Sequence, residues 1–192
     1  MAIDKVTSAS ITTDAVGPTQ LNEASNYAFT GTVTGAGGIT EADTFRKSST
    51  QAISAGVSTV LSGFSRDDEA TFSKIGTGLS ESSGVFTFGA TGIYFVTASF
   101  YMRINGDLTY GSLFIEGTAN NSSYTPLAYN DQSIKQVSGN TYACNYVSSI
   151  FDCQDTSNYK FRLKTYATHV FDIIGGSGTN YTYTTAIRLA DT

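Results

Sequence analysis

The sequence predicts an all-β fold, and three observations support that prediction. Glycine is frequent, with 19 residues against 2 prolines, and 12 Phe and 12 Tyr supply many rings that favour strands. No window of ten or more residues carries a helical period of apolar side chains. Short apolar runs alternate with stretches of Ser, Thr, Asn and Gly, as in proteins built from many short strands. A length of 192 residues fits one such domain with an appendage.

The chain is organised around residues 84–102, which read as a strand, a glycine turn and a longer strand that together form a hairpin. Successive strand residues point to opposite faces, so the long strand divides into two rows. One row is wholly apolar: Tyr94, Val96, Ala98, Phe100 and Met102. The other begins with Ile93 and Phe95 and ends with polar residues. Because a solvated strand needs only one apolar face, another part of the chain or another copy should cover the second.

The sequence around this stretch predicts further strands and the connections between them. Strand-like runs lie at 50–64, 70–75, 113–115, 146–153 and 159–166. A loop is expected at 65–69 and a turn at 105–107. Residues 117–140 form a long polar insert, which we expect to be irregular. Strands at this spacing, joined by glycine-rich turns, predict a sandwich or a jelly roll.

Residues 1–40 differ from the body at 41–192 and are interpreted as an extended arm. Their apolar residues recur at every fifth position, at Val6, Ile11, Val16 and Leu21. This period fits neither a helix nor a flat strand, and four anchors cannot build a core. The arm is therefore expected to attach along a partner surface or to wind with identical chains. The alternative is a flexible linker.

Composition excludes several classes of function. The net charge of −5 and the pI near 4.7 argue against binding nucleic acid, which needs a basic surface. No stretch of about twenty apolar residues is present, so no membrane span is predicted. The N-terminus lacks the pattern of an export signal. Cys144 and Cys153 fall on one predicted strand, too far apart for a disulfide without a bend, and two free buried thiols are expected.

No catalytic, cofactor or metal site is predicted. His169 is the single histidine, whereas a jelly-roll metal site uses two or three, so a packed or surface residue is expected. Asp67, Asp68 and Glu69 could hold a hard cation, but adjacent acids point apart and a solvated loop is favoured. The glycine clusters at 35–38 and 175–178 lack a following Lys-Ser/Thr and read as turns.

Two features could recognise a partner. Within the polar insert, Asn121, Tyr124, Tyr129 and Asn130 have the composition of adaptable binding loops, which is also that of any exposed β-protein loop. On the strand at 159–166, alternate positions carry Lys160, Arg162 and Lys164. This basic row could meet an acidic partner, and a solvated face explains it equally well.

Residues 84–88 (Gly-Val-Phe-Thr-Phe) and 92–96 (Gly-Ile-Tyr-Phe-Val) resemble the signature of the C1q and tumour-necrosis-factor-like (TNF-like) jelly roll. Residues 183–191 are similar to the closing strand of that family. The resemblance spans about residues 44–191 and implies a ten-stranded, two-sheet sandwich that forms a tight homotrimer. It places Ile93 and Phe95, with Tyr183 or its neighbours, at a threefold interface. The family's turn proline and collagen-like stalk are absent.

Residues 10–16, Leu21 and residues 26–37 resemble segments near fibre and appendage domains in virion proteins of tailed bacterial viruses, especially marine ones. This resemblance implies a structural virion protein on the particle surface, made in the host cytoplasm and anchored to capsid or tail proteins by Val6, Ile11, Val16 and Leu21. The length favours a capsid decoration (cement) protein or short appendage. The alternatives are a receptor-binding tail-fibre tip that uses the loops at 117–140, with a host-surface glycan as a candidate ligand, and, less favoured, a free C1q-like carbohydrate-binding or ligand-binding protein. An enzyme is not expected.

Overall fold

In the computed structural model the chain divides into Met1–Gly37 and Gly38–Thr192. The structure describes residues 38–67 and 70–192, and we call this part the head. Every regular element of these residues is a β-strand. The prediction of an all-β body is therefore confirmed. Val6, Ile11, Val16 and Leu21 lie outside the described residues, and their role stays a prediction.

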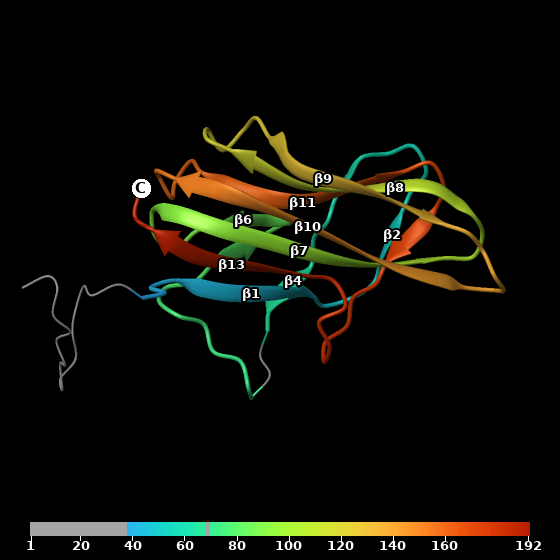
Figure 1. Ribbon diagram of the computed structural model, residues 1–192, viewed down its shortest axis with the longest axis horizontal. Helices are drawn as coiled ribbons and strands as arrows, with labels where there is room; N and C mark the ends of the chain where they lie inside the picture. Colours follow the sequence, from blue (N-terminus) through green and yellow to red (C-terminus); the bar gives the residue numbers. More distant parts are fainter. Residues whose placement is uncertain (1–37, 68–69) are drawn as a thin grey trace, which may run out of the picture. The chain divides into compact units, whose positions relative to one another are not determined.

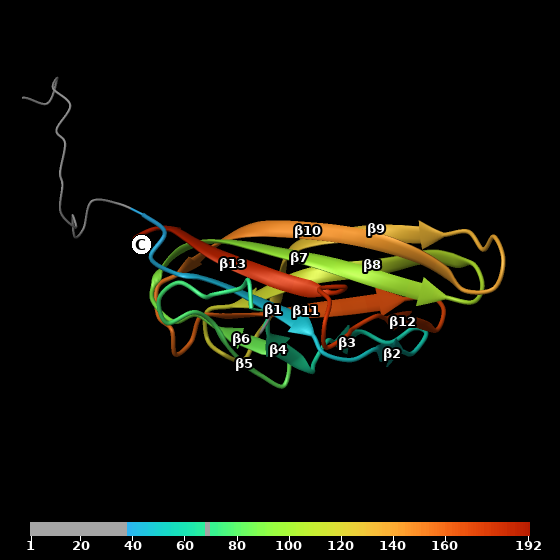
Figure 2. The same cartoon turned by 90° about the horizontal axis from the view of Figure 1, so that it is seen from below.

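Two antiparallel sheets make up the head (Figures 1 and 2). Sheet A has seven strands: β1 (Ala42–Lys47), β2 (Gln51–Ile53), β4 (Phe64–Arg66), β7 (Gly92–Ile104), β10 (Thr141–Cys153), β12 (Phe171–Ile173) and β13 (Tyr183–Ala190). Sheet B has six: β3 (Thr59–Val60), β5 (Ser80–Ser82), β6 (Val85–Thr87), β8 (Leu108–Thr118), β9 (Thr125–Ile134) and β11 (Lys160–Ala167). Several of these strands have only two or three residues, which is why the described residues hold more than the ten expected.

The core lies between the sheets and contains the alternating residues read from the sequence. In β7 every second side chain is buried, and the wholly apolar row of the sequence is the inward one. In β11, Phe161 and Leu163 are fully buried, and the Phe161 ring stacks on Phe86 of β6 at 4.8 Å. Burial of apolar side chains at these positions supplies most of the favourable free energy of the fold.

The organising stretch is not a hairpin, contrary to its interpretation as one. β6 pairs with β5 and β11 in sheet B, whereas β7 pairs with β10, β12 and β13 in sheet A. The stretch therefore crosses from one sheet to the other and carries apolar residues into the core from both sides. Gly92 has φ of +149°, and a Cβ there would lie 2.2 Å from Nε of Arg188, so glycine is required.

Two other predictions about the body were wrong. Residues 70–75 form no strand, and only Ile75 makes an isolated bridge to Ala42. The insert at 117–140 is largely regular, because it contains the end of β8 and all of β9. β9 is an edge strand with most side chains exposed. An edge strand with so little burial needs no alternation of apolar and polar residues, which is why the pattern was not visible.

The directions of the strands define two ends of the head. β1 begins at the end where β7 and β11 begin and β8, β10 and β13 finish, so the chain enters the head beside its own C-terminus (Figure 1). The loop at 119–124 lies at this entry end. The opposite end, or far end, carries the turn at 105–107 and the loop at 135–140.

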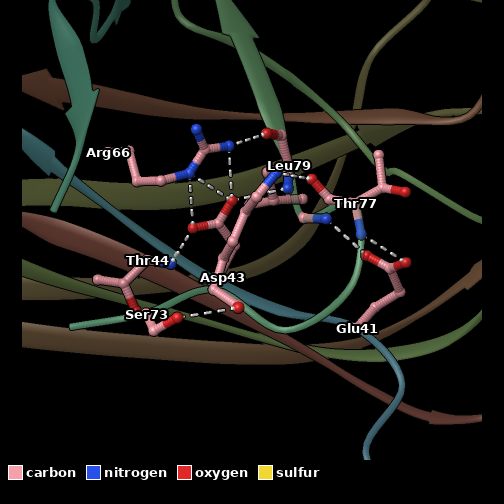
Figure 3. A network of polar contacts seen from close by, with 9 residues as sticks. Glu41, Asp43, Thr44, Arg66, Ser73, Thr77 and Leu79 are labelled. Atoms are coloured by element: carbon pink, nitrogen blue, oxygen red, sulfur yellow. Dashed lines mark hydrogen bonds and ion pairs between the residues drawn. The ribbon is translucent and has the colours of Figure 1, made fainter. Parts of the chain in front are cut away.

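Two carboxylates fix the start of the head, Glu41 just before β1 and Asp43 within it (Figure 3). Glu41 accepts hydrogen bonds from the backbone N–H groups of Thr77 and Gly78 at 3.0 and 2.6 Å. Asp43 is 2% exposed, accepts from the backbone N–H of Leu79 at 2.9 Å and forms an ion pair with Arg66 at 2.9 Å. These bonds fix the irregular segment before β5 to the first strand of the head.

The acidic loop at 65–69 is not simply solvated, so that prediction is corrected for Asp67. Its carboxylate is buried and accepts hydrogen bonds from Nη1 of Arg46 at 2.9 Å and from Nδ2 of Asn180 at 2.7 Å. A buried charge requires such partners, and no local pattern predicts the pairing of two residues 21 positions apart. Asp68 and Glu69 lie outside the described residues.

Candidate interaction surfaces

The outer side of sheet A, which we call the apolar face, contains the residues predicted for a threefold interface. Ile93 and Phe95 point outward from β7 and are half-buried. Tyr183 is the partner of Ser99 in the pairing of β13 with β7, so its outward side chain lies on the same face. The structure therefore brings these three residues together on one surface. Whether that surface meets another copy stays a prediction.

The pairing of strands adds apolar residues that sequence reasoning did not assign to this face. Ile150 of β10 and Ile187 of β13 are the two neighbours of Phe95, so three apolar side chains form a row across the sheet. Tyr146 of β10 lies beside Ser99 in the same way. Ile150 is 56% exposed and Tyr146 52% exposed. Their alternation was visible in the sequence, but their place beside β7 depends on a register that it does not reveal.

The far-end part of the apolar face consists of stacked tyrosines. The Tyr101 ring lies 5.5 Å from that of Tyr142 and 5.7 Å from that of Tyr181. Arg103 pairs with Asp172 at 2.6 Å beside this stack. Desolvation in the cluster raises the pKa of the Tyr101 hydroxyl. The face thus changes from aliphatic at the entry end to aromatic at the far end. Its charges include Asp152, opposite Ile93 on β10, and the Arg103–Asp172 pair.

The outer side of sheet B, which we call the charged face, carries both features that could recognise a partner. These are the tyrosines of the polar insert and the basic row of β11. Tyr124 covers the guanidinium of Arg162 at 4.0 Å, and the Tyr129 ring stacks on Phe114 at 5.5 Å. Lys164 lies over the other side of Phe114 at 4.7 Å. The predicted loop tyrosines and the basic row therefore form one surface.

The other two predicted recognition residues lie elsewhere. Asn121 is exposed at the turn after β8, has φ of +54°, and donates its backbone N–H to the carbonyl of Asn158. Asn130 follows Tyr129 along β9, so its side chain points to the opposite side of that strand. The four residues thus do not form a single loop.

Glu116 of β8 is the functional residue of the charged face that sequence reasoning missed. It is 2% exposed although it points outward, because Arg162 and Lys164 both pair with its carboxylate. The Arg162 contact is 2.7 Å. A carboxylate bridging two cations fixes both of their side chains and lowers the cost of ordering them on binding. Only the pairing of β8 with β11 places residues 46 positions apart side by side.

The cysteines are both free, as expected, but only one is buried. Cys153 faces the core, and desolvation raises its pKa to about 11. Cys144 is exposed on the apolar face beside Tyr101, so the prediction of two buried thiols was wrong for it. The two residues have opposite parity on β10, which is enough to put one on each side of the sheet.

The structure places the single histidine and tests for clusters of metal-binding side chains among the described residues. His169 is exposed, and its Nδ1 lies 3.0 Å from the Thr168 hydroxyl. Across residues 38–67 and 70–192, no group of three His, Cys, Asp or Glu side chains could hold a metal ion. The same residues include no helix long and apolar enough to cross a membrane.

The head has hollows at both ends. At the entry end a cavity of about 390 Å³ opens between β9 and β10 and has both apolar and polar walls, among them Leu127, Ile150, Asp152 and Tyr159. At the far end two polar hollows adjoin, of about 560 and 410 Å³, and share Ile104, Asn105 and Val170. Asp107, Gln136 and His169 line the larger one. Hydrogen bonds from Lys135 and from the Gln136 backbone lower the pKa of Asp107.

Comparisons with known proteins define the class of fold. No family model and no curated protein matches the sequence. A solved structure of Eiger TNF from S. frugiperda matches with a TM-score of 0.60 and 13% identity, over 79% of this chain and 93% of that chain. Murine APRIL, crystallised at pH 8.5, matches with a TM-score of 0.56 and 12% identity, over 78% and 98%.

The head therefore has a TNF-like jelly-roll fold, as the signature at residues 84–96 predicted. At 11–13% identity the likeness concerns the fold alone. None of these findings supports the resemblance of residues 10–37 to virion fibre proteins, which stays a prediction.

Proposed function

We propose that the protein is a structural virion protein of a tailed bacterial virus, in which three heads associate through the apolar face and residues 1–40 attach them to the particle. A capsid decoration protein or a short appendage fits this arrangement best. The protein would be made in the host cytoplasm, and its role would be non-catalytic. The observation that carries the proposal is the apolar face, with its row of Ile150, Phe95 and Ile187.

The apolar face supports association with identical copies. A row of exposed and half-buried apolar side chains is costly in water and usually marks an interface. The face also bears few charges that a partner would have to neutralise, and charges are depleted at interface cores. A closed trimer would cover this surface on every copy and would leave no apolar surface for further growth. Light scattering that reports a stable monomer at micromolar concentration would refute this part of the proposal.

The spacing of Val6, Ile11, Val16 and Leu21 supports attachment by the arm. Each buried aliphatic side chain contributes about 1.5–3 kcal/mol. Ordering the backbone costs roughly 1–2 kcal/mol per residue, so the side chains alone cannot hold twenty residues in place. Attachment therefore also requires hydrogen bonds between the arm's backbone and the particle.

Deletion of residues 1–25 tests the arm. The truncated protein should stay folded and trimeric but should no longer bind particles. Ile11→Asp with Val16→Asp should have nearly the same effect, whereas Tyr124→Ala with Tyr129→Ala should leave particle binding intact. Normal occupancy by the truncated protein would assign attachment to the head and make the arm a linker.

A receptor-binding tail-fibre tip is the second candidate, and the far end of the head favours it. Any attachment through the arm reaches the head at the entry end, which leaves the polar hollows at Asn105, Gln136 and His169 facing away. Carboxamide, carboxylate and imidazole groups suit the hydroxyls of a host-surface glycan. Purified virions with this chain located on capsid or tail would decide between the two candidates. A free C1q-like carbohydrate-binding protein is the third candidate.

A further inference from the structure

We propose that the charged face of sheet B binds an acidic polysaccharide, with the sugar rings against its tyrosines and the sugar carboxylates on its cations. This inference goes beyond the proposed function and does not depend on it. The face lies on the opposite side of the sandwich from the apolar face. It therefore stays accessible whether the head is a monomer or a trimer.

The charged face gathers cations although the chain has a net charge of −5, because Lys160, Arg162 and Lys164 lie on alternate positions of one strand. Glu116 pairs with Arg162 and Lys164. Asp131 of β9 is the second carboxylate on this face, and it accepts a hydrogen bond from the Ser112 hydroxyl. Three cations against two carboxylates leave an excess of one positive charge, and Lys160 has no ion pair among the described residues. An acidic ligand is the partner that such a local field attracts.

Exposed tyrosine rings lie along the same face. Tyr129 is 64% exposed at the edge of the sheet, and its inner side is covered by Phe114. Tyr110 is 37% exposed, and its ring lies 6.2 Å from that of Tyr166. The electron-rich ring faces attract the weakly positive C–H groups of a pyranose. Lys164 packs against Phe114, so rings and cations alternate along the surface.

The cations of the charged face are held in place before any ligand binds. Glu116 is 2% exposed beneath Arg162 and Lys164 and holds them by ion pairs, and Tyr124 covers Arg162 from above. Side chains fixed in this way lose little conformational entropy on binding. Because Nε and Nη2 of Arg162 point to Glu116, Nη1 is left to donate to a ligand carboxylate.

The charged face is long. Its rings and cations lie alongside β8 from Tyr110 to Glu116, which is about 20 Å at roughly 3.4 Å per strand residue. The surface is therefore long enough for several linked sugars. The three hollows described above are lined by other residues, so a sugar chain lying across the sheet fits this surface better than a single sugar in one of those hollows.

The experiment titrates the full chain with tetragalacturonate, using calorimetry at low and at physiological salt. Maltotetraose serves as the neutral probe and hexaglutamate as the acidic peptide. We expect tetragalacturonate to bind, more weakly as salt rises, with the other two probes at least about tenfold weaker. Lys160→Glu and Tyr129→Ala should each reduce affinity about tenfold. Both residues are partly or largely exposed, so these variants should fold.

Matched controls separate the charged face from the rest of the surface. Tyr146→Ala removes a comparably exposed tyrosine from sheet A, and Lys135→Gln removes an exposed cation at the far end. Both should leave affinity unchanged. Absence of tetragalacturonate binding, equal binding of hexaglutamate or maltotetraose, or equal losses in the controls would overturn the proposal. Equal binding of hexaglutamate would point to an acidic protein partner. None of these readouts depends on particle attachment or trimer mass, which test the proposed function.

Discussion

The two outer faces of the sandwich differ in the side chains that they expose to solvent. The apolar face leaves Ile150 and Tyr146 more than half exposed, with few charges among them. The charged face pairs most of its charges internally, since Glu116 pairs with two cations and Phe114 lies between Lys164 and Tyr129. The first surface leaves apolar side chains in water, whereas the second leaves only rings and one excess positive charge exposed. A jelly roll can thus carry two kinds of interaction surface on one core.

Disrupting the apolar face should have the largest effect. Phe95→Asp places a charge in the middle of the row between Ile150 and Ile187, where a covered carboxylate would have no partner. The protein should change from a trimer to a monomer of 20.4 kDa. Sedimentation velocity measures this change. Tyr129→Asp, a comparable change on the charged face, should remain trimeric; if it also dissociates, the two faces are not independent.

Removing Glu116 should have the next largest effect. Glu116→Ala leaves two partly buried cations without their shared carboxylate, which should reduce the free energy of unfolding by about 2–3 kcal/mol. Asp172→Ala breaks the more exposed pair with Arg103 and should cost about 0–1 kcal/mol. Urea unfolding of both variants measures the difference. Equal losses would contradict the view that the charged face pairs most of its charges internally.

The raised pKa of the buried Cys153 thiol predicts a loss of stability at alkaline pH. Cys153 ionises near pH 9 in an unfolded chain and near 11 in the head, because burial disfavours the thiolate. The free energy of unfolding is therefore unaffected by this thiol below pH 9. Between pH 9 and 11 the thiol ionises in the unfolded chain but not in the head, which lowers the free energy of unfolding by up to about 2 kcal/mol. Cys153→Ala should flatten this part of the stability curve.

The smallest expected effect concerns the rate at which the exposed Cys144 thiol is modified. Cys144 lies on the apolar face beside Tyr101, so a neighbouring copy should restrict access to it. Iodoacetamide should modify Cys144 several-fold more slowly in the trimer than in the Phe95→Asp monomer. Mass spectrometry follows the rate. Identical rates in the two proteins would mean that the interface leaves this part of β10 uncovered.

Sequence reasoning succeeded where burial imposes a pattern. β7 was predictable because Tyr94, Val96 and Phe100 alternate with residues of the other face, and β11 because Phe161 and Leu163 do the same. β9 was not, since an exposed edge strand imposes no alternation. The crossing from β6 to β7 was mistaken for a hairpin because the glycine turn has the same composition in both cases.

The candidate surfaces were predictable only in part, for a different reason. Ile93 and Phe95 belong to one strand, so their shared face follows from parity alone. Glu116 beside Arg162, and Ile150 beside Phe95, depend on the register between strands far apart in sequence. Likewise, the sequence does not distinguish Asp67 from its acidic neighbours, because its partners Arg46 and Asn180 are far from it in sequence. Pairing across the sheet is long-range information that local periodicity does not contain.

The attachment of β1 has a mechanical consequence. Its backbone pairs with β13 from Ala42 to Arg46 and with β4 from Phe45 to Lys47. A pull on the chain at residue 38 along β1 loads these hydrogen bonds together, in shear, instead of opening them one after another. Glu41 and Asp43 add side-chain bonds to Thr77, Gly78, Leu79 and Arg66 at the point where tension enters. The first strand of the head is thus arranged to resist a pull that enters the head at residue 38.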